Sequence, residues 1–273
     1  MLKRFVDIVE EDGFRAALES TYVFLLRKTG VYDKYKKIKI NSAINKLSRD
    51  TDNGIYINYD KMARNEIARL CDKYGTDKGT LSPDSNPYPW PSHNYSDFYE
   101  LIFSSRKESV ETLLECGIGT TNTDIANNMG ENGSPGASLR VWRDYFPNAE
   151  IVGIDIDREV MFSEERIDTY CVDQTSKESI QRFLTDVEAD EFDIIIDDGL
   201  HEYHANFTLF ENTIDRLSED GIYIIEDVHY GDLKKYREYF DGTSESYHVK
   251  FVDLENPKRT SREDDRLIMI SPY

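Results

Sequence analysis

The sequence has few cysteines, fewer basic than acidic residues, and no long apolar run. Its 273 residues contain 33 Lys and Arg against 53 Asp and Glu, which gives a net charge of −20. Such a charge disfavours proteins that bind nucleic acid through phosphates or attach electrostatically to an anionic membrane. No apolar stretch approaches the roughly 18–20 residues of a membrane-spanning helix, and a signal-peptide pattern is missing. We therefore expect neither a nucleic-acid partner nor a membrane span.

The three cysteines, Cys71, Cys116 and Cys171, show no zinc-binding spacing and cannot all pair with one another. This pattern favours a reducing, cytoplasmic compartment. The acidic excess fits either a well-solvated surface or adaptation to high intracellular salt. A chain of this length suits one α/β domain with an appendage, or two small domains.

Regular alternation of apolar runs and amphipathic segments begins after Glu108. Before it, residues 1–70 carry helical apolar faces, so we assign them to an N-terminal helical extension and residues 71–273 to the main domain. The alternation indicates a parallel sheet covered on both faces. The predicted strands are Thr112–Cys116, Glu150–Asp155, Thr169–Val172, Phe192–Asp197 and Gly221–Ile225. The predicted helices are Met62–Tyr74, Ser96–Phe103, Leu139–Tyr145, Lys177–Asp186, His204–Leu217 and Leu233–Phe240.

Two further strands, Tyr247–Leu254 and Arg266–Ile270, leave no room for a helix between them. We therefore expect them to form an antiparallel hairpin at the edge of the sheet. Five parallel strands finished by such a hairpin are the plan of class I methyltransferases, whereas a dinucleotide-binding fold would need a sixth parallel strand. The predicted fold is thus α/β, a Rossmann-like sheet of seven strands with an N-terminal helical extension.

Two acidic clusters follow neighbouring predicted strands. Asp197 and Asp198 stand at the end of one strand with His201 just beyond them, and Glu226 and Asp227 follow the next. Parallel strands would bring all five side chains to the same sheet edge, where so much negative charge is costly without a cation. A hard divalent ion with oxygen ligands, and a histidine that can take a proton, fit this pattern. Each cluster alone also fits a solvated strand end or a helix cap.

The first three predicted strands end in residues suited to an adenosine-containing ligand. Gly117 and Gly119 let the backbone approach a ligand closely. Asp155 can accept hydrogen bonds from a ribose diol, and Asp173 and Gln174 lie where an adenine amino group can be met. Taken singly, each residue also fits an ordinary turn or a solvated strand end.

A long insertion from Thr120 to Gly136 separates the glycine turn from the next helix. It is rich in Asn and Gly, so we expect a loop that forms a lid over the cofactor. Ser138 then offers a hydroxyl cap at the helix start, and the free amides there can receive a carboxylate.

The order of the motifs between residues 74 and 227 resembles that of metal-dependent sugar O-methyltransferases related to those that methylate macrolide sugars. The resemblance covers over half of the chain and excludes residues 1 to about 65. Besides the two acidic clusters it rests on Tyr74-Gly75-Thr76-Asp77-Lys78-Gly79, His93-Asn94-Tyr95, Phe98-Tyr99-Glu100, Glu115-Cys116-Gly117-Ile118-Gly119, Gly136-Ala137-Ser138-Leu139-Arg140-Val141-Trp142, Tyr145-Phe146-Pro147-Asn148-Ala149 and Gly153-Ile154-Asp155.

This resemblance implies S-adenosylmethionine as methyl donor, Mg²⁺ or a similar divalent ion, and a sugar hydroxyl as acceptor. It implies that Asp198, Glu226 and Asp227 bind the metal and that His201 is the general base. A sugar diol bound to the ion would become more acidic at the hydroxyl that accepts the methyl group. The residues we assign to cofactor binding are Glu115, Gly117, Gly119, Ser138, Asp155, Asp173, Gln174 and Asp197.

Several alternatives stay open at this point. The acceptor can be a surface glycan, its lipid-linked precursor or a glycosylated metabolite, or the carboxylate of a hexuronic acid, which would need no general base. A nucleotide-cofactor oxidoreductase and a non-catalytic scaffold of the same fold are alternatives of other classes. His93 and Tyr95 either meet the substrate or only pack, and Asp77 and Lys78 either close over the cofactor or form a salt bridge in a turn. The N-terminal helices could form a homo-oligomer or shape the acceptor pocket.

Overall fold

The computed structural model describes residues 54–57, 65–79, 87–88, 90–242, 246–254 and 265–273. These residues belong to one compact unit of the chain. Most of the predicted N-terminal extension lies outside the described residues, so its boundary and its role stay predictions. Among the helices that the structure describes, none is long and apolar enough to cross a membrane.

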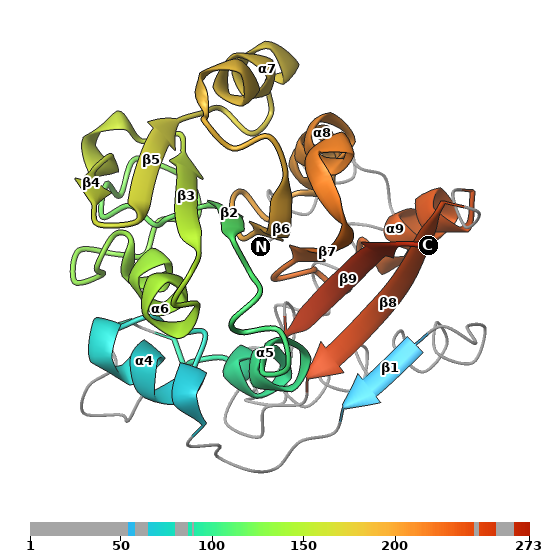
Figure 1. Ribbon diagram of the computed structural model, residues 1–273, viewed down its shortest axis with the longest axis horizontal. Helices are drawn as coiled ribbons and strands as arrows, with labels where there is room; N and C mark the ends of the chain where they lie inside the picture. Colours follow the sequence, from blue (N-terminus) through green and yellow to red (C-terminus); the bar gives the residue numbers. More distant parts are fainter. Residues whose placement is uncertain (1–53, 58–64, 80–86, 89, 243–245, 255–264) are drawn as a thin grey trace, which may run out of the picture. The chain divides into compact units, whose positions relative to one another are not determined.

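One sheet of nine strands forms the centre of this unit, in the order β1-β8-β9-β7-β6-β2-β3-β5-β4 (Figure 1). The strands β2, β3, β5, β6 and β7 are parallel, and β9 runs antiparallel to both β7 and β8. The α/β class and the terminal hairpin are thereby confirmed. The strands are β1 Gly54–Ile57, β2 Thr112–Cys116, β3 Glu150–Asp155, β4 Ser163–Glu164, β5 Ile167–Cys171, β6 Phe192–Asp197, β7 Leu217–Ile225, β8 Tyr247–Leu254 and β9 Arg266–Pro272.

The predicted count of seven strands is too low by two. The short strand β4 pairs antiparallel with β5 at one edge. At the other edge β1 pairs parallel with β8, so the hairpin does not form the edge of the sheet as predicted. Strands of two and four residues are too short to show the alternation of apolar and polar residues that marks a strand. Neither strand could therefore be predicted from the sequence.

Helices cover both faces of the sheet (Figure 1). On one face α4 (Glu66–Tyr74) packs against α5 (Tyr95–Phe103) and α6 (Ala137–Tyr145). On the other face α7 (Lys177–Asp186) packs against α8 (Tyr203–Thr213), and Phe207 of α8 contacts the aromatic rings of α9 (Leu233–Asp241). Two short 3-10 helices complete the elements, η1 Arg158–Val160 and η2 Ile214–Arg216.

An aromatic cluster fixes α5 and α6 beneath the sheet. Tyr99 stacks on Phe103 with ring centroids 5.3 Å apart and meets the edge of Trp142 at 5.2 Å. Phe103 in turn contacts Phe146 at 5.5 Å. All four side chains are fully buried, and such ring contacts add to the stabilisation from buried apolar area. The cluster thereby holds the Tyr99 hydroxyl in a fixed place near the strand tips.

Candidate metal and cofactor site

The two acidic clusters meet at one edge of the sheet, as the sequence predicts. Strands β6 and β7 are parallel neighbours, with Asp197 opposite Ile225. Beyond the ladder, the Glu226 amide donates to the Asp197 carbonyl at 2.9 Å, and the Asp198 amide donates to the Cys116 carbonyl of β2 at 2.9 Å. Three neighbouring strand tips are thus joined by backbone hydrogen bonds.

Asp198, His201 and Asp227 form a group whose ligand atoms lie within 4.8 Å of one another. His201 Nε2 lies 3.2 Å from Asp198 Oδ1, and His201 Nδ1 lies 3.9 Å from Asp227 Oδ2. Carboxylate oxygens are the donors that Mg²⁺ and similar hard cations prefer. This donor set therefore fits a divalent ion held by the acids with an imidazole beside it.

Glu226 turns toward a buried lysine instead of toward this group. Lys78 Nζ lies 2.7 Å from Glu226 Oε2, 2.5 Å from Asp198 Oδ2 and 3.4 Å from Glu115 Oε1. The Tyr99 hydroxyl donates a hydrogen bond to the other Glu226 oxygen. Lys78 thus links acids from three strands, β2, β6 and β7, and its ion pairs are with these acids and not with Asp77.

Burial and charge shift the protonation of these groups in opposite directions. Burial raises the pKa of Glu226, although Lys78 opposes the shift. Burial alone would also raise the pKa of Asp198, but Lys78 and His201 together hold it below its usual value. Burial would lower the pKa of His201, yet Asp198 and Asp227 outweigh it and raise it to about 10. Without a bound cation the imidazole is therefore protonated at neutral pH.

Asp197 points away from the other acids. Its carboxylate is buried and accepts hydrogen bonds from Gln174 Nε2 at 2.6 Å and Asn206 Nδ2 at 2.8 Å, and burial raises its pKa to about 6. Gln174 Oε1 accepts from the Leu200 amide at 2.9 Å. These two predicted cofactor residues therefore brace the loop that carries Asp198 and His201.

The glycine turn after β2 lets other parts of the protein approach its backbone closely, and its contact with a ligand stays a prediction. Gly117 and Gly119 have φ of 85° and 84°, a region that residues with a side chain rarely adopt. A Cβ on Gly117 would lie 2.1 Å from the Asp198 carbonyl oxygen. Asp155 Oδ2 accepts from the Ile118 amide at 3.0 Å, which ties β3 to this turn. The next residue, Ile156, leaves an apolar side chain 55% exposed at the strand tip.

Ser138 is not the helix cap that the sequence suggests. Helix α6 begins at Ala137 with Gly136 as N-cap, and no side chain caps it. The Ser138 hydroxyl instead donates to buried Glu115 at 2.7 Å. Asp173 accepts from both the amide and the hydroxyl of Thr175, at 2.9 and 2.6 Å. The side chains of these predicted cofactor residues thus have partners within the protein.

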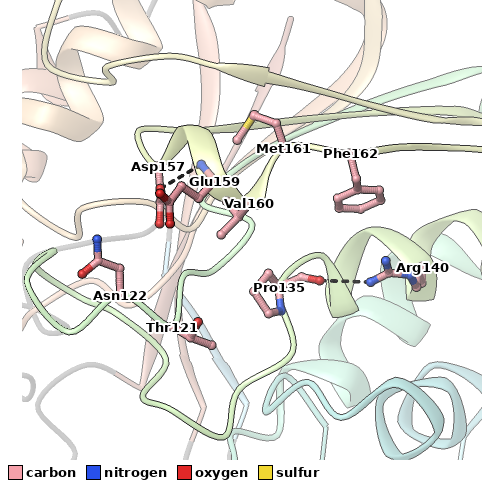
Figure 2. A pocket seen from close by; sticks show the side chains of 9 residues that line it. All are labelled: Thr121, Asn122, Pro135, Arg140, Asp157, Glu159, Val160, Met161 and Phe162. Atoms are coloured by element: carbon pink, nitrogen blue, oxygen red, sulfur yellow. Dashed lines mark hydrogen bonds between the residues drawn. The ribbon is translucent and has the colours of Figure 1, made fainter.

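A cavity of about 640 Å³ opens between the insertion loop and the segment after β3 (Figure 2). The loop contributes Thr121, Asn122 and Pro135, and α6 contributes Arg140. Residues 157 and 159–162 form the opposite side, and none of the predicted cofactor residues lines the cavity. The insertion therefore walls a hollow next to the strand tips that carry the glycine turn and Asp155.

The sequence brought Lys78, His93, Tyr95 and Tyr99 to notice, but it did not show that these residues are the partners that hold the acids. The first three come from the chain between α4 and the start of α5, where two backbone bonds bring distant residues together. The His93 amide donates to the Asp77 carbonyl at 2.8 Å, and the Ser96 amide donates to the Lys78 carbonyl at 2.9 Å. The motifs around these residues carried the resemblance, but no local pattern shows where such a loop folds back.

The fold is that of the class I methyltransferases. The structure aligns with crystal structures of MycE, a methyltransferase of mycinamycin biosynthesis, in complex with Mg and SAH, with or without mycinamycin VI, at TM-scores of 0.53 and 0.54. The alignments cover 77% of this chain and 54–55% of MycE, at 21–22% identity. At this identity the likeness shows a shared fold.

Curated relatives confirm the resemblance to sugar O-methyltransferases. A Streptomyces olivaceus 8-demethyl-8-α-L-rhamnosyl tetracenomycin-C 2′-O-methyltransferase is 29% identical over 72% of this chain and 48% of its own length. The mycinamicin VI 2″-O-methyltransferase of Micromonospora griseorubida is 32% identical over 56% of this chain and 37% of its own. This chain thus spans less than half the length of these relatives. No protein-family model matches it.

Proposed function

We propose that this protein is an S-adenosylmethionine- and divalent-metal-dependent O-methyltransferase that acts on a sugar hydroxyl. The observation that carries the proposal is the approach of Asp198, Asp227 and His201 at the tips of two parallel strands, beside a glycine turn shaped for close contact. The relatives methylate hydroxyls of sugars on natural products, which supports a sugar as the acceptor.

In this proposal Asp198 and Asp227 hold the ion, with Glu226 behind them, and His201 takes the proton of the acceptor hydroxyl. When bound, the ion lowers the pKa of that hydroxyl and the cofactor provides an electrophilic methyl group. Neutralising the two acids also removes the main cause of the raised His201 pKa. His201 then becomes neutral and able to act as a base near physiological pH.

The cofactor would lie across the tips of β2 and β3, against the backbone of the turn at Gly117 and Gly119, where Asp155 and Ile156 offer a carboxylate and an apolar surface. The acceptor is proposed to be a sugar of a glycan, of a lipid-linked glycan or of a glycosylated metabolite. We place the enzyme in the cytoplasm, where free cysteines such as Cys71 remain reduced, and keep a homo-oligomer as a proposal.

Transfer of a labelled methyl group to simple α-L-rhamnosides and to fractionated cell glycans tests this function. We expect transfer that stops on addition of chelator and returns with Mg²⁺. Asp198→Asn should abolish it. Binding of S-adenosylhomocysteine, measured as a rise in melting temperature that NAD does not cause, tests the cofactor separately. Transfer that chelator and Asp198→Asn leave unchanged would contradict the metal-dependent mechanism.

His201→Ala separates the two acceptor classes. It should slow transfer to a hydroxyl by about 10²–10⁴-fold, the usual contribution of a general base, but largely spare ester formation on a uronic acid. His204→Ala is the matched control, because His204 is 63% exposed and lies beside Glu202 at the surface. Equal rates in the two variants with a rhamnoside would argue against His201 as the base.

A further inference from the structure

Asp198 and Asp227 each direct one carboxylate oxygen toward His201 and the other oxygen toward residues outside this pair of acids. Asp198 directs Oδ1 to His201 and Oδ2 to Lys78. Asp227 directs Oδ2 to His201, while Oδ1 accepts a hydrogen bond from the Tyr95 hydroxyl and lies 3.5 Å from His93 Nε2. Each acid therefore keeps one oxygen toward the shared centre, and its other oxygen is held by residues from the chain between α4 and the start of α5.

The backbone at this centre needs such support. His201 and Asp227 have φ of 58° and 50°, in the left-handed region. Residues with a side chain are rare there, and the conformation costs about 1–3 kcal/mol unless neighbouring contacts impose it. Because Asp227 lies just beyond the end of β7, after Glu226, a change in its backbone would turn its carboxylate away from His201.

His93 is itself fixed on both sides of its ring. It is 4% exposed and stacks on Tyr95 with ring centroids 4.3 Å apart. Its Nδ1 lies 3.3 Å from Oδ1 of Asp265, a fully buried acid directly before β9. One ring nitrogen thus faces Asp265 and the other faces Asp227, which fixes the direction in which His93 meets the site.

We infer that His93 and Tyr95 are positioning residues that hold Asp227 in the orientation in which it binds the divalent ion, and that they act through Asp227 and not through the acceptor. The inference rests on the proposed function, and it assigns a role to two residues that could equally have met the substrate. Groups that orient the ligands of a metal typically change its affinity by about 10–100-fold when they are removed.

Binding of Mn²⁺ to the purified full chain, measured by calorimetry, tests the inference without relying on activity. Tyr95→Phe should weaken binding by about 10–100-fold. Tyr145→Phe is the control: it removes an equally buried hydroxyl that has no hydrogen-bond partner among the described residues, and it should leave the affinity unchanged. Equal Mn²⁺ affinity in Tyr95→Phe and the control would overturn the inference for Tyr95.

Two replacements of His93 separate positioning from simple packing. The amide of Gln can reach the place of Nε2 and keep the contact with Asp227, whereas that of Asn replaces Nδ1 and keeps only the contact with Asp265. His93→Asn should therefore weaken Mn²⁺ binding about as much as Tyr95→Phe does, and His93→Gln should restore most of it. Equal losses in the two variants would show a merely structural role.

A different result of the Mn²⁺ binding experiment would refute the proposed function. If the unmodified protein does not bind Mn²⁺, or binds it as well after Asp198→Asn, the metal site itself is refuted and this inference with it. If the unmodified protein binds and only Asp198→Asn weakens binding, the metal site stands and the inference falls. At saturating Mn²⁺ we expect an unchanged KM for the sugar acceptor in Tyr95→Phe; a raised KM would mean that Tyr95 contacts the acceptor.

Discussion

Replacing Lys78 by methionine should destabilise the protein through the acids that its ammonium group neutralises. Lys78 is 3% exposed and lies within 3.4 Å of oxygens of Glu115, Asp198 and Glu226. Methionine has a similar length and fills the space, so the loss is one of charge. Two fully buried acids, Glu115 and Glu226, and the partly buried Asp198 would remain without this cation.

Removing one partner of a buried ion pair costs about 3–5 kcal/mol, because the remaining charge stays uncompensated. For a domain of this size each kcal/mol lowers the melting temperature by about 2–4 °C. We therefore expect a fall of roughly 6–20 °C on these two estimates. The difference in melting temperature between Lys78→Met and the unmodified protein should shrink as the pH is lowered. Burial raises the pKa of Glu226 and Glu115, so protonation removes their charge.

Scanning calorimetry without divalent ions, at about pH 9 and about pH 6, on either side of the Glu226 pKa of about 8, measures this effect. Lys73→Met is the matched control. Lys73 also pairs with an acid, Asp144 at 2.8 Å, but it is 57% exposed, and exposed pairs contribute little. A melting temperature for Lys78→Met as close to the unmodified protein as that of Lys73→Met would refute the buried ion-pair centre.

Two further predictions concern the same centre. In the metal-free protein His201 should titrate near pH 10 by NMR, and Mg²⁺ should lower that value. The folded pKa of His201 exceeds the unfolded value of about 6.5, so the stability that His201 adds is complete below that pH and is lost as the pH rises through about 10. His201→Asn should remove this dependence of the unfolding free energy on pH. An unchanged pH dependence would contradict the assignment. Gly117→Ala should destabilise the protein more than Gly75→Ala in denaturant titrations. Both need positive φ, which costs about 1–2 kcal/mol, but only at Gly117 would the new Cβ also meet the backbone of Asp198; equal losses would contradict the tight turn.

The parts of the fold that follow from local pattern were predictable from the sequence. Strands β3 and β6 match their predicted bounds, because continuous apolar runs between polar residues define a doubly buried strand. The ends of β6 and β7 placed Asp198, His201 and Asp227 together, since parallel neighbours end at one edge. The edge strands β1 and β4 depend on pairing with strands distant in the sequence or are very short, so no local signal reveals them.

The side-chain directions at the site could not be read in the same way. Asp197 and Asp198 are adjacent, yet Asp197 faces Asn206 of α8 while Asp198 faces Lys78. Alternation along a strand separates them, but which acid meets the metal depends on the loop after the strand. Glu226 points into the protein because it pairs with Lys78 and accepts a hydrogen bond from Tyr99. The position of Lys78 depends in turn on how the segment after α4 folds back.

Strand β7, which Glu226 and Asp227 follow, lies between β6 and β9, and β9 is the last of the described strands to leave the ribosome. Residues 268–270 must pair with Tyr223–Ile225 before the open edge of β7 is covered, and Asp265 must arrive before His93 has its second neighbour. A nascent chain that has produced both acidic clusters therefore cannot yet align them. The reactive centre is therefore complete only when β9, which follows both acidic clusters in the sequence, has joined the sheet.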